Sequence, residues 1–119
     1  KNIKLPVSAP FHCYLMNNAT KTMVKELNKL NFKNSPKKLI SNVTAKEILD
    51  EKDLKELLIK QIEMRVRWRE SILYMIDKGV SHFIEIGPGK VLSGLIKRIN
   101  KDVKITSINE QSDIESLLI

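Results

Sequence analysis

The sequence predicts an α/β fold in which a short parallel sheet is flanked by helices. Amphipathic helical patterns alternate along the chain with short apolar stretches typical of strands, and glycine, proline or asparagine residues separate many of these segments. Strands joined by helical crossovers run parallel, so this alternation favours a parallel sheet with helices on its faces. Ligands of such sheets bind beyond the carboxyl ends of the strands, where we expect functional residues.

The segment before residue 44 is expected to form one helix and one strand. A helix of about 16 residues is predicted because apolar residues recur at steps of three and four, which gives it one packing face. The residues on this face are Leu15, Ala19, Met23, Leu27 and Leu30, with Met16 and Val24 beside them. Asn28, Asn31 and Pro36 then interrupt the pattern, and residues 38–43 predict a short strand.

A second helix is predicted around residues 54–62, where leucine and isoleucine residues share one face. Gln61 lies on the same face and must find a hydrogen-bond partner if it is buried. Two candidate capping boxes offer side-chain oxygens to the unpaired amides of a helix start: Thr44 with Glu47, and Asp53 with Glu56.

Further alternation of helix and strand is expected after residue 67. A helix over residues 68–76 should end at Lys78 and Gly79, because a cation and a glycine are typical of helix C-termini. Residues 82–86 are rich in aromatic and β-branched side chains and lead into glycines, which predicts a buried strand. The next helix is expected over residues 90–100, with its core face formed by Val91, Leu92, Leu95, Ile96 and Ile99.

The end of the chain predicts one more strand and a short helix. Residues 103–108 have the residue types of a strand. Ser112 with Glu115 is then expected to begin a terminal helix that reaches Leu117 and Leu118.

Composition limits the classes of protein to which the chain can belong. At 119 residues with 42% hydrophobic residues, it is about one domain long and is expected to be globular. No apolar run approaches the roughly 20 residues of a membrane span, and one cysteine with two histidines is too few for a disulfide or a zinc site. We therefore expect a cytoplasmic location, no metal and no cofactor. The opening without methionine, in a proline-containing loop, suggests part of a longer protein.

The chain is strongly basic, with 21 basic and 14 acidic residues and a formal net charge of +7. Three interpretations stay open at this point: a solvated basic surface, an acidic protein partner, or nucleic acid. The basic residues are spread through every segment and few aromatic residues accompany them, which disfavours base stacking.

The candidate motifs of catalysis are few. The glycines at 87, 89 and 94 do not have the spacing of a Walker or dinucleotide loop, so a tight strand-to-helix turn is the favoured interpretation. Ser8 and Ser93 are not flanked as in a nucleophile elbow, and Cys13 is expected to be inert. His12, placed after Pro10 and before the first helix, is a candidate base, although a lone histidine more often has no catalytic role.

Four separate segments resemble the malonyl-CoA:acyl carrier protein transacylase family. Residues 5–16 (Leu-Pro-Val-Ser-Ala-Pro-Phe-His-Cys-Tyr-Leu-Met) are similar to the family's active-site histidine segment, and residues 41–43 (Ser-Asn-Val) to its Asn-Val strand. Gln61 lies in a stretch like the family's Arg/Lys-Gln-hydrophobic helix. Residues 66–68 and 85–92 complete the match in order and spacing.

The resemblance implies transfer of malonyl from malonyl-CoA to the phosphopantetheine thiol of acyl carrier protein through a serine ester, in fatty-acid biosynthesis. His12 would be the general base, and the main-chain carbonyl of Gln61 would accept the other ring N–H in place of a triad carboxylate. Acyl carrier proteins are acidic, so Lys60, Arg65 and the neighbouring Arg67 and Arg69 are candidate contacts.

The resemblance further implies that the chain is the C-terminal portion of such an enzyme, without the N-terminal part. Residues 1–12 would end a small ferredoxin-like subdomain, and residues 13–119 would belong to a larger hydrolase-like one. The nucleophilic serine would lie upstream of His12, so the chain should be inactive alone. Two alternatives stay open: an acyltransferase domain of a polyketide or multienzyme synthase, and a non-catalytic basic module that binds an acidic protein or nucleic acid.

Overall fold

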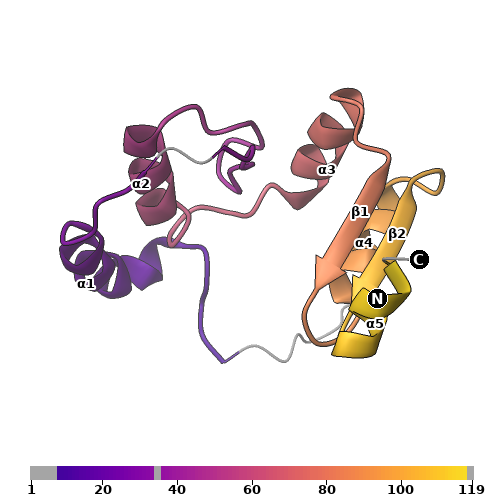
Figure 1. Ribbon diagram of the computed structural model, residues 1–119. Coiled ribbons are helices and arrows are strands. Elements are labelled where there is room, and N and C mark those ends of the chain that lie inside the picture. Colours follow the sequence, from indigo (N-terminus) through magenta and orange to yellow (C-terminus); the bar gives the residue numbers. More distant parts are fainter. Residues whose placement is uncertain (1–7, 34–35, 118–119) are drawn as a thin grey trace. The chain divides into compact units, whose positions relative to one another are not determined.

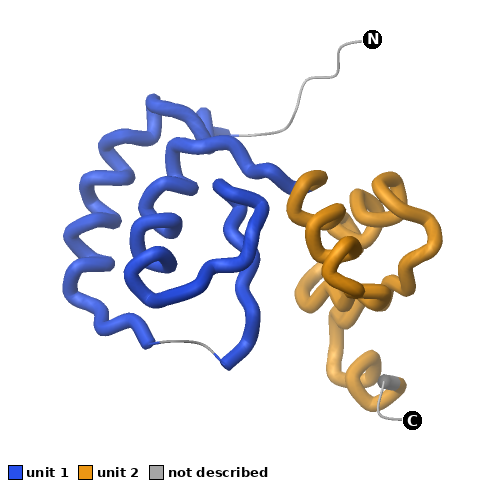
Figure 2. Tube along the Cα trace, turned by 90° about the horizontal axis from the view of Figure 1, so that it is seen from above, with its two compact units in different colours: residues 1–68 blue, residues 69–119 orange. Residues whose placement is uncertain are grey.

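The computed structural model describes residues 8–33 and 36–117, and it confirms the predicted α/β class. The chain divides into two compact units, residues 1–68 and 69–119 (Figure 2). Residues 5–7 of the histidine segment and Leu118 lie outside the described residues. The predicted subdomain boundary after residue 12 concerns a longer protein and stays a prediction.

The first unit begins with a short helical segment that differs from the predicted single helix. A 3-10 turn, η1 (Tyr14–Met16), leads directly into helix α1 (Asn17–Leu27), which packs against helix α2 (Glu51–Lys60) (Figure 1). Leu27 is buried, whereas Leu30 lies beyond the helix end and is 56% exposed. The helix is shorter than predicted because the chain leaves it in tight turns, where the Leu30 N–H donates to the Leu27 carbonyl.

The strand predicted over residues 38–43 is wrong. Only Ile40 pairs, in an isolated antiparallel bridge with Glu47, and the residues between them form a turn. The buried Ser41 explains the difference, because its hydroxyl accepts the N–H groups of Val43 at 3.1 Å and Thr44 at 3.4 Å. Such local bonds compete with the hydrogen bonds of a strand ladder.

Both predicted capping boxes are also wrong. Helix α2 begins at Glu51, and the carboxylate of Asp50 accepts the Asp53 N–H at 2.8 Å. Thr44 lies in the preceding turn, where its hydroxyl accepts the Lys46 N–H at 3.3 Å. The cap therefore lies three residues before Asp53, where an acidic side chain can reach a free amide of the first turn.

The second unit confirms the predicted parallel sheet. Helix α3 (Trp68–Asp77) ends at Lys78 and Gly79 as expected, and Gly79 has the positive φ of 89° that suits a glycine. Strands β1 (His82–Ile86) and β2 (Lys104–Ile108) pair in parallel, from His82 with Lys104 to Ile86 with Ile108. Helix α4 (Val91–Ile99) connects the two strands and packs on one face of the sheet (Figure 1).

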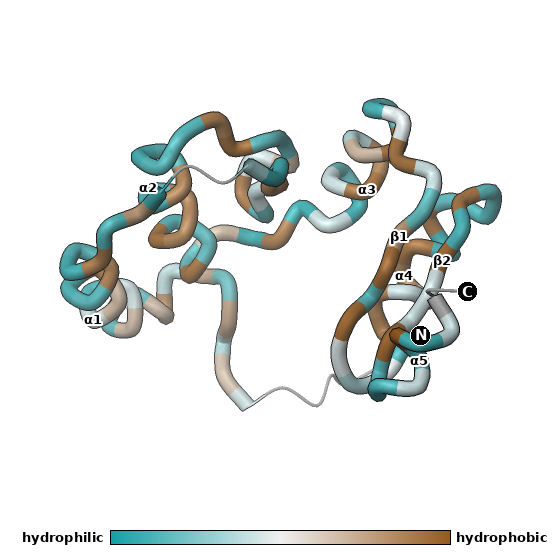
Figure 3. The backbone as a smooth tube through the Cα atoms, viewed as in Figure 1, coloured by the Kyte–Doolittle hydropathy of each residue, from teal (hydrophilic) through white to brown (hydrophobic). Residues whose placement is uncertain are grey.

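Strand β1 is not buried on both faces as predicted. Phe83 faces the core and is 8% exposed, but Ile84 and Ile86 on the opposite face are 48% and 78% exposed. The apolar character of β1 and α4 can be followed in Figure 3. Helix α4 differs in the same way, because Ile96 is its buried residue while Val91, Leu92 and Leu95 are exposed. Among the described residues, the β1 part of the face that carries Ile84 and Ile86 therefore lacks a covering layer, although sheets of this kind are normally covered on both faces.

The terminal helix α5 (Gln111–Leu117) packs against β2. Its start is fixed by Asp113 rather than by Ser112, because the Asp113 carboxylate accepts the N–H groups of Asn109 at 2.7 Å and Glu110 at 3.2 Å. None of the described helices is long and apolar enough to cross a membrane.

Candidate functional site

His12 lies in an exposed loop of the first unit, between Pro10 and η1. Its φ of 60° is in the left-handed region, which costs an L-residue about 1–2 kcal/mol. Local hydrogen bonds hold the loop: the Phe11 N–H donates to the Ala9 carbonyl at 2.9 Å, and the Cys13 thiol to the Pro10 carbonyl at 3.1 Å. Strain of this kind concentrates at functional sites, which makes the loop a candidate.

The main-chain carbonyl of Gln61 lies 2.8 Å from the Nδ1 atom of His12. Gln61 is the residue that follows the last turn of α2, and its own N–H donates to the Leu57 carbonyl at 3.0 Å. The carbonyls at the end of a helix have no partner within the helix and carry the negative end of its dipole. A carbonyl can only accept, so this contact places a proton on Nδ1 and leaves Nε2 as the proton acceptor of the neutral ring.

The side chain of Gln61 has a partner of its own. The Asn42 amide nitrogen donates to Gln61 Oε1 at 3.2 Å. The half-buried Gln61 side chain, which lies on the apolar face of α2, therefore has the hydrogen-bond partner that a buried polar group requires. Asn42 is in turn bonded through its main-chain carbonyl, which accepts the Arg67 N–H at 2.9 Å. His12, Gln61 and Asn42 thus form one hydrogen-bonded series within the first unit.

A second contact ties α1 to the loop that follows α2. The side-chain amide of Asn17, the first residue of α1, donates to the Glu63 carboxylate at 3.1 Å. Glu63 lies two residues after Gln61 in the turn that leaves α2. The two segments that carry His12 and Gln61 are therefore joined by more than the histidine contact.

The geometry permits general acid–base chemistry at Nε2. An imidazole with a fixed Nδ1 proton can accept a proton from a hydroxyl or thiol and later return it, while the carbonyl stabilises the charged ring. Cys13 does not serve as the partner, because its thiol donates to Pro10. The hydroxyl of Ser93, in the second unit, pairs with that of Ser107 at 2.9 Å. Within residues 8–33 and 36–117, no cluster of three metal-ligating side chains is present.

The glycine turn between β1 and α4 has the structure of a tight strand-to-helix connection. Gly87 and Gly89 have φ values of 136° and 92°, and the Gly89 N–H donates to Asn109 Oδ1 at 2.7 Å. The Glu85 carboxylate accepts the N–H groups of Leu92 at 3.0 Å and Ser93 at 2.8 Å. Because a carboxylate already uses these amides, the helix start does not offer them to a phosphate.

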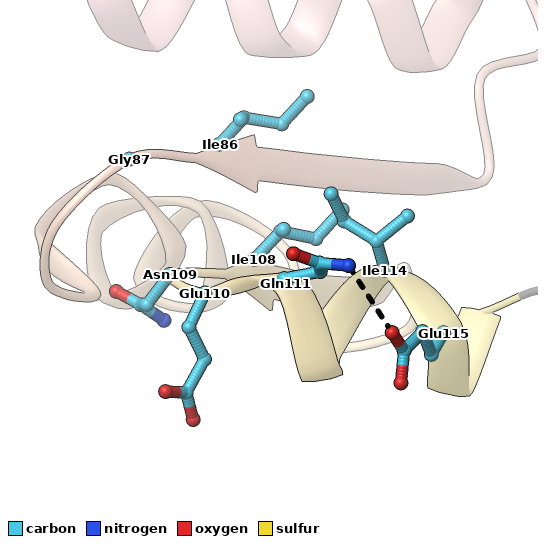
Figure 4. A pocket seen from close by; sticks show the side chains of 8 residues that line it. All are labelled: Ile86, Gly87, Ile108, Asn109, Glu110, Gln111, Ile114 and Glu115. Atoms are coloured by element: carbon cyan, nitrogen blue, oxygen red, sulfur yellow. Dashed lines mark hydrogen bonds between the residues drawn. The ribbon is translucent and has the colours of Figure 1, made fainter.

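A pocket lies at the carboxyl ends of β1 and β2, where ligands of parallel sheets are expected (Figure 4). Its lining is formed by Ile86, Gly87, Ile108, Asn109, Glu110, Gln111, Ile114 and Glu115. The Gln111 amide donates to the Glu115 carboxylate at 3.4 Å. These residues include two glutamates and no serine, cysteine or histidine.

Lys60 and Arg67, which the sequence suggested as partner contacts, have structural roles. Lys60 pairs with Glu56 on the surface of α2. Arg67 is half-buried, and its Nη1 donates to the Thr44 carbonyl at 3.3 Å. The sequence pattern missed this role of Arg67 and the bond between Asn42 and Gln61. The match of residues 41–43 to a known motif was the one signal that pointed to Asn42.

Comparisons with known proteins give a consistent result. No family model matches the chain. It is 43% identical over 113 residues to a malonyl CoA-acyl carrier protein transacylase of Bacillus subtilis, covering 95% of this chain and 36% of the relative. The corresponding protein of Staphylococcus aureus (strain COL) is 42% identical over 111 residues, with 93% and 36% covered. The chain thus spans about a third of the length of these relatives.

Solved structures show the same similarity in three dimensions. The transacylase of Clostridium perfringens superposes with a TM-score of 0.90 and 41% identity, covering 98% of this chain and 37% of that one. The acyl-carrier-protein S-malonyltransferase of Bartonella henselae gives 0.89 and 43%, with 96% and 36% covered. A further match, at 0.89 and 32% identity, is a malonyl-transacylase solved in complex with a type II polyketide acyl carrier protein, covering 96% of this chain and 37% of that one.

These relatives are acyl-group transferases by name, and the chain matches one segment of this class of protein in both sequence and fold. Within this class, the chain is similar to one segment of the malonyl CoA-acyl carrier protein transacylases, about a third of their length. Its length relative to these proteins agrees with the expected C-terminal portion.

Proposed function

We propose that the chain provides the general base of a malonyl transferase that moves malonyl from coenzyme A to acyl carrier protein. The observation that carries the proposal is the 2.8 Å contact between His12 Nδ1 and the Gln61 carbonyl, which fixes the ring with Nε2 as the proton acceptor. The relatives' names, and the solved complex with an acyl carrier protein, support the substrate and the partner. The carrier protein in that complex belongs to a type II polyketide synthase, so malonyl transfer in polyketide synthesis is the second candidate function.

In the proposed mechanism, His12 moves one proton in each half-reaction. Nε2 takes the proton of a serine hydroxyl as the serine oxygen attacks the thioester carbon of malonyl-CoA. The carbon–sulfur bond then breaks, and the imidazolium returns the proton to the coenzyme A thiolate. The second half-reaction repeats these steps with the acyl carrier protein thiol attacking the serine ester. The serine belongs to a part of the protein outside this chain, so the 119-residue chain should not turn over alone.

The proposal is tested best in a chimaera. This chain replaces the matching segment of the Clostridium perfringens transacylase, which amounts to 37% of that protein. The chimaera should load malonyl and transfer it to acyl carrier protein, and His12→Ala should reduce the transfer rate by at least about 10²-fold because the general base is lost. Malonyl transfer is followed by mass spectrometry of the acyl carrier protein.

Two variants keep this experiment interpretable. His12→Asn tests the fold, because asparagine lacks an imidazole and, glycine apart, tolerates a left-handed φ better than most residues. His82→Gln is the matched control at the second histidine, whose Nε2 lies 2.8 Å from the Thr106 hydroxyl. A folded chimaera without transfer activity, or near-normal loading by His12→Asn, would contradict the proposal. Equal losses in the variants of both histidines would contradict a specific role of His12.

A further inference from the structure

We propose that Asn42 is a positioning residue for His12 that acts through Gln61. Its side-chain amide holds the Gln61 side chain at 3.2 Å, and the carbonyl of the same Gln61 holds His12 Nδ1 at 2.8 Å. The two contacts meet in one residue at the end of α2, so the orientation of the histidine ring depends on the turn that carries Asn42. The catalytic consequence rests on the function proposed above, whereas the structural coupling does not.

The turn that carries Asn42 is fixed on several sides. The main-chain carbonyl of Asn42 accepts the Arg67 N–H at 2.9 Å, and Arg67 Nη1 donates to the Thr44 carbonyl at 3.3 Å. Ser41 and Ala45 are buried, and the Ala45 N–H donates to the Ser41 carbonyl at 2.9 Å. Asn42 therefore projects from a braced turn, which gives it a stable position from which to hold another residue.

The carbonyl of Gln61, by contrast, lies at the C-terminal end of a helix, where the last carbonyls have no partner within the helix. Helix ends fray, and the turn after α2 mixes ordinary and longer hydrogen bonds: the Met64 N–H donates to the Lys60 carbonyl at 3.0 Å, whereas the Ile62 N–H reaches the Ile59 carbonyl at 3.3 Å. Catalytic geometry is sensitive to displacements of about 0.5 Å. A second attachment of Gln61, through its side chain, restrains the carbonyl that His12 uses.

The alternative is that the Asn42–Gln61 bond only satisfies two half-buried amides. A double-mutant cycle separates the two interpretations, because Gln61→Ala removes the side-chain bond and keeps the main-chain carbonyl. If Asn42 acts through the Gln61 side chain, then Asn42→Ala, Gln61→Ala and the double variant should all perturb His12 to the same extent. If the bond only satisfies polar groups, stability changes while His12 does not.

The measurement is the ¹⁵N chemical shift of the imidazole nitrogens in the ¹⁵N-histidine-labelled 119-residue chain, which reports the fraction of rings protonated at Nδ1. We expect Asn42→Ala and Gln61→Ala to lower this fraction for His12 equally, the double variant to lower it no further, and His82 to stay constant as an internal reference. Asn31→Ala, at an exposed asparagine, is the matched control and should change nothing. Asn42→Ser, which is too short to reach Gln61, replaces Asn42→Ala if circular dichroism shows that the latter is unfolded.

An unchanged His12 signal in folded Asn42→Ala or Asn42→Ser would overturn the proposal, as would additive effects in the double variant. In the chimaera, Asn42→Ala should lower kcat by about tenfold or more with little change in KM, because misplacement of a catalytic group reduces the rate of the chemical step. If the His12 variants of the chimaera keep their activity while the ¹⁵N cycle shows coupling, the proposed function fails and the positioning role of Asn42 stands.

Discussion

At the scale of the residue, His12 and Ala45 share a backbone conformation that residues other than glycine rarely adopt, with φ values of 60° and 57°. Ala45 is buried in the turn that carries Asn42, and His12 lies in the loop that faces Gln61. Both strained positions thus belong to the part of the first unit that orients the histidine ring. The strain is maintained by the surrounding hydrogen bonds, as expected where backbone geometry serves a site.

The core of the second unit depends on Ile72. It is 1% exposed, whereas its neighbour Leu73 on α3 is 37% exposed. Ile72→Ala should lower the free energy of unfolding by about 2–5 kcal/mol, because it removes buried methyl groups and leaves a cavity. Leu73→Ala is the matched control and should cost clearly less. Chemical denaturation measures both, and equal losses would show that α3 does not pack through Ile72.

At the scale of the element, α4 begins with a cap that comes from the preceding strand. The Glu85 carboxylate on β1 accepts amide protons of Leu92 and Ser93, and its sequence distance from them hides the role from any local capping pattern. The pKa of the Glu85 carboxyl lies below its ordinary value. The largest cause is a hydrogen bond from the Ser93 side chain, and the next is the hydrogen bond from the Ser93 backbone. The negative charge also suits the positive end of the helix dipole.

This cap predicts a pH dependence with a defined sign. A carboxyl whose pKa is lowered in the folded state contributes stability that is fully present above its ordinary pKa and is lost as the pH falls through the lowered value. Glu85→Gln should therefore destabilise the chain at neutral pH, and the difference from the unmutated chain should shrink in acid. Denaturation at a series of pH values measures this. Glu110→Gln, at an exposed glutamate, is the control, and a constant difference at Glu85 across the series would contradict the cap.

Two element predictions failed for a related reason. Residues 38–43 have the composition of a strand, yet the Ser41 hydroxyl bonds to the following amides and folds the segment into a turn. The cap of α2 is Asp50 rather than Asp53, because the helix starts earlier than its apolar face does. Side-chain oxygens that bond to nearby amides outweigh residue preferences here, and the sequence does not show which amide each oxygen reaches.

At the scale of the whole molecule, two properties depend on the chain as a whole: its net charge and its uncovered apolar surface. The formal net charge is +7, and the basic residues are distributed over both units. Ile84 and Ile86 present an exposed apolar face on a strand of a parallel sheet, a kind of sheet that is normally covered on both faces. The relatives, which are nearly three times as long, contain further chain that could provide such a cover.

Under the proposed function, in which the partner is an acidic acyl carrier protein, the net charge predicts a salt-dependent encounter. Long-range attraction raises the association rate, and it weakens as the Debye length falls from about 30 Å at 0.01 M to about 10 Å at 0.1 M salt. The rate of malonyl transfer by the chimaera at sub-saturating carrier protein should therefore fall over this range. Stopped reactions at several salt concentrations measure it, with sucrose as an uncharged control. A rate that does not respond to salt would contradict a role of the net charge in this encounter.

The sequence by itself determined the alternation of helices and strands in the second unit. These elements follow from local features of the chain, namely the spacing of apolar residues and the glycines that end α3 and join β1 to α4. The sequence also pointed to His12 and Gln61 through a family resemblance. The resemblance also implied that the Gln61 carbonyl meets His12, and the structure places these two groups 2.8 Å apart across 49 positions. Only the tertiary structure decided that Asn42 meets the Gln61 side chain across 19 positions. Such contacts depend on how the chain returns on itself, and no local pattern of side chains encodes the direction of a main-chain carbonyl.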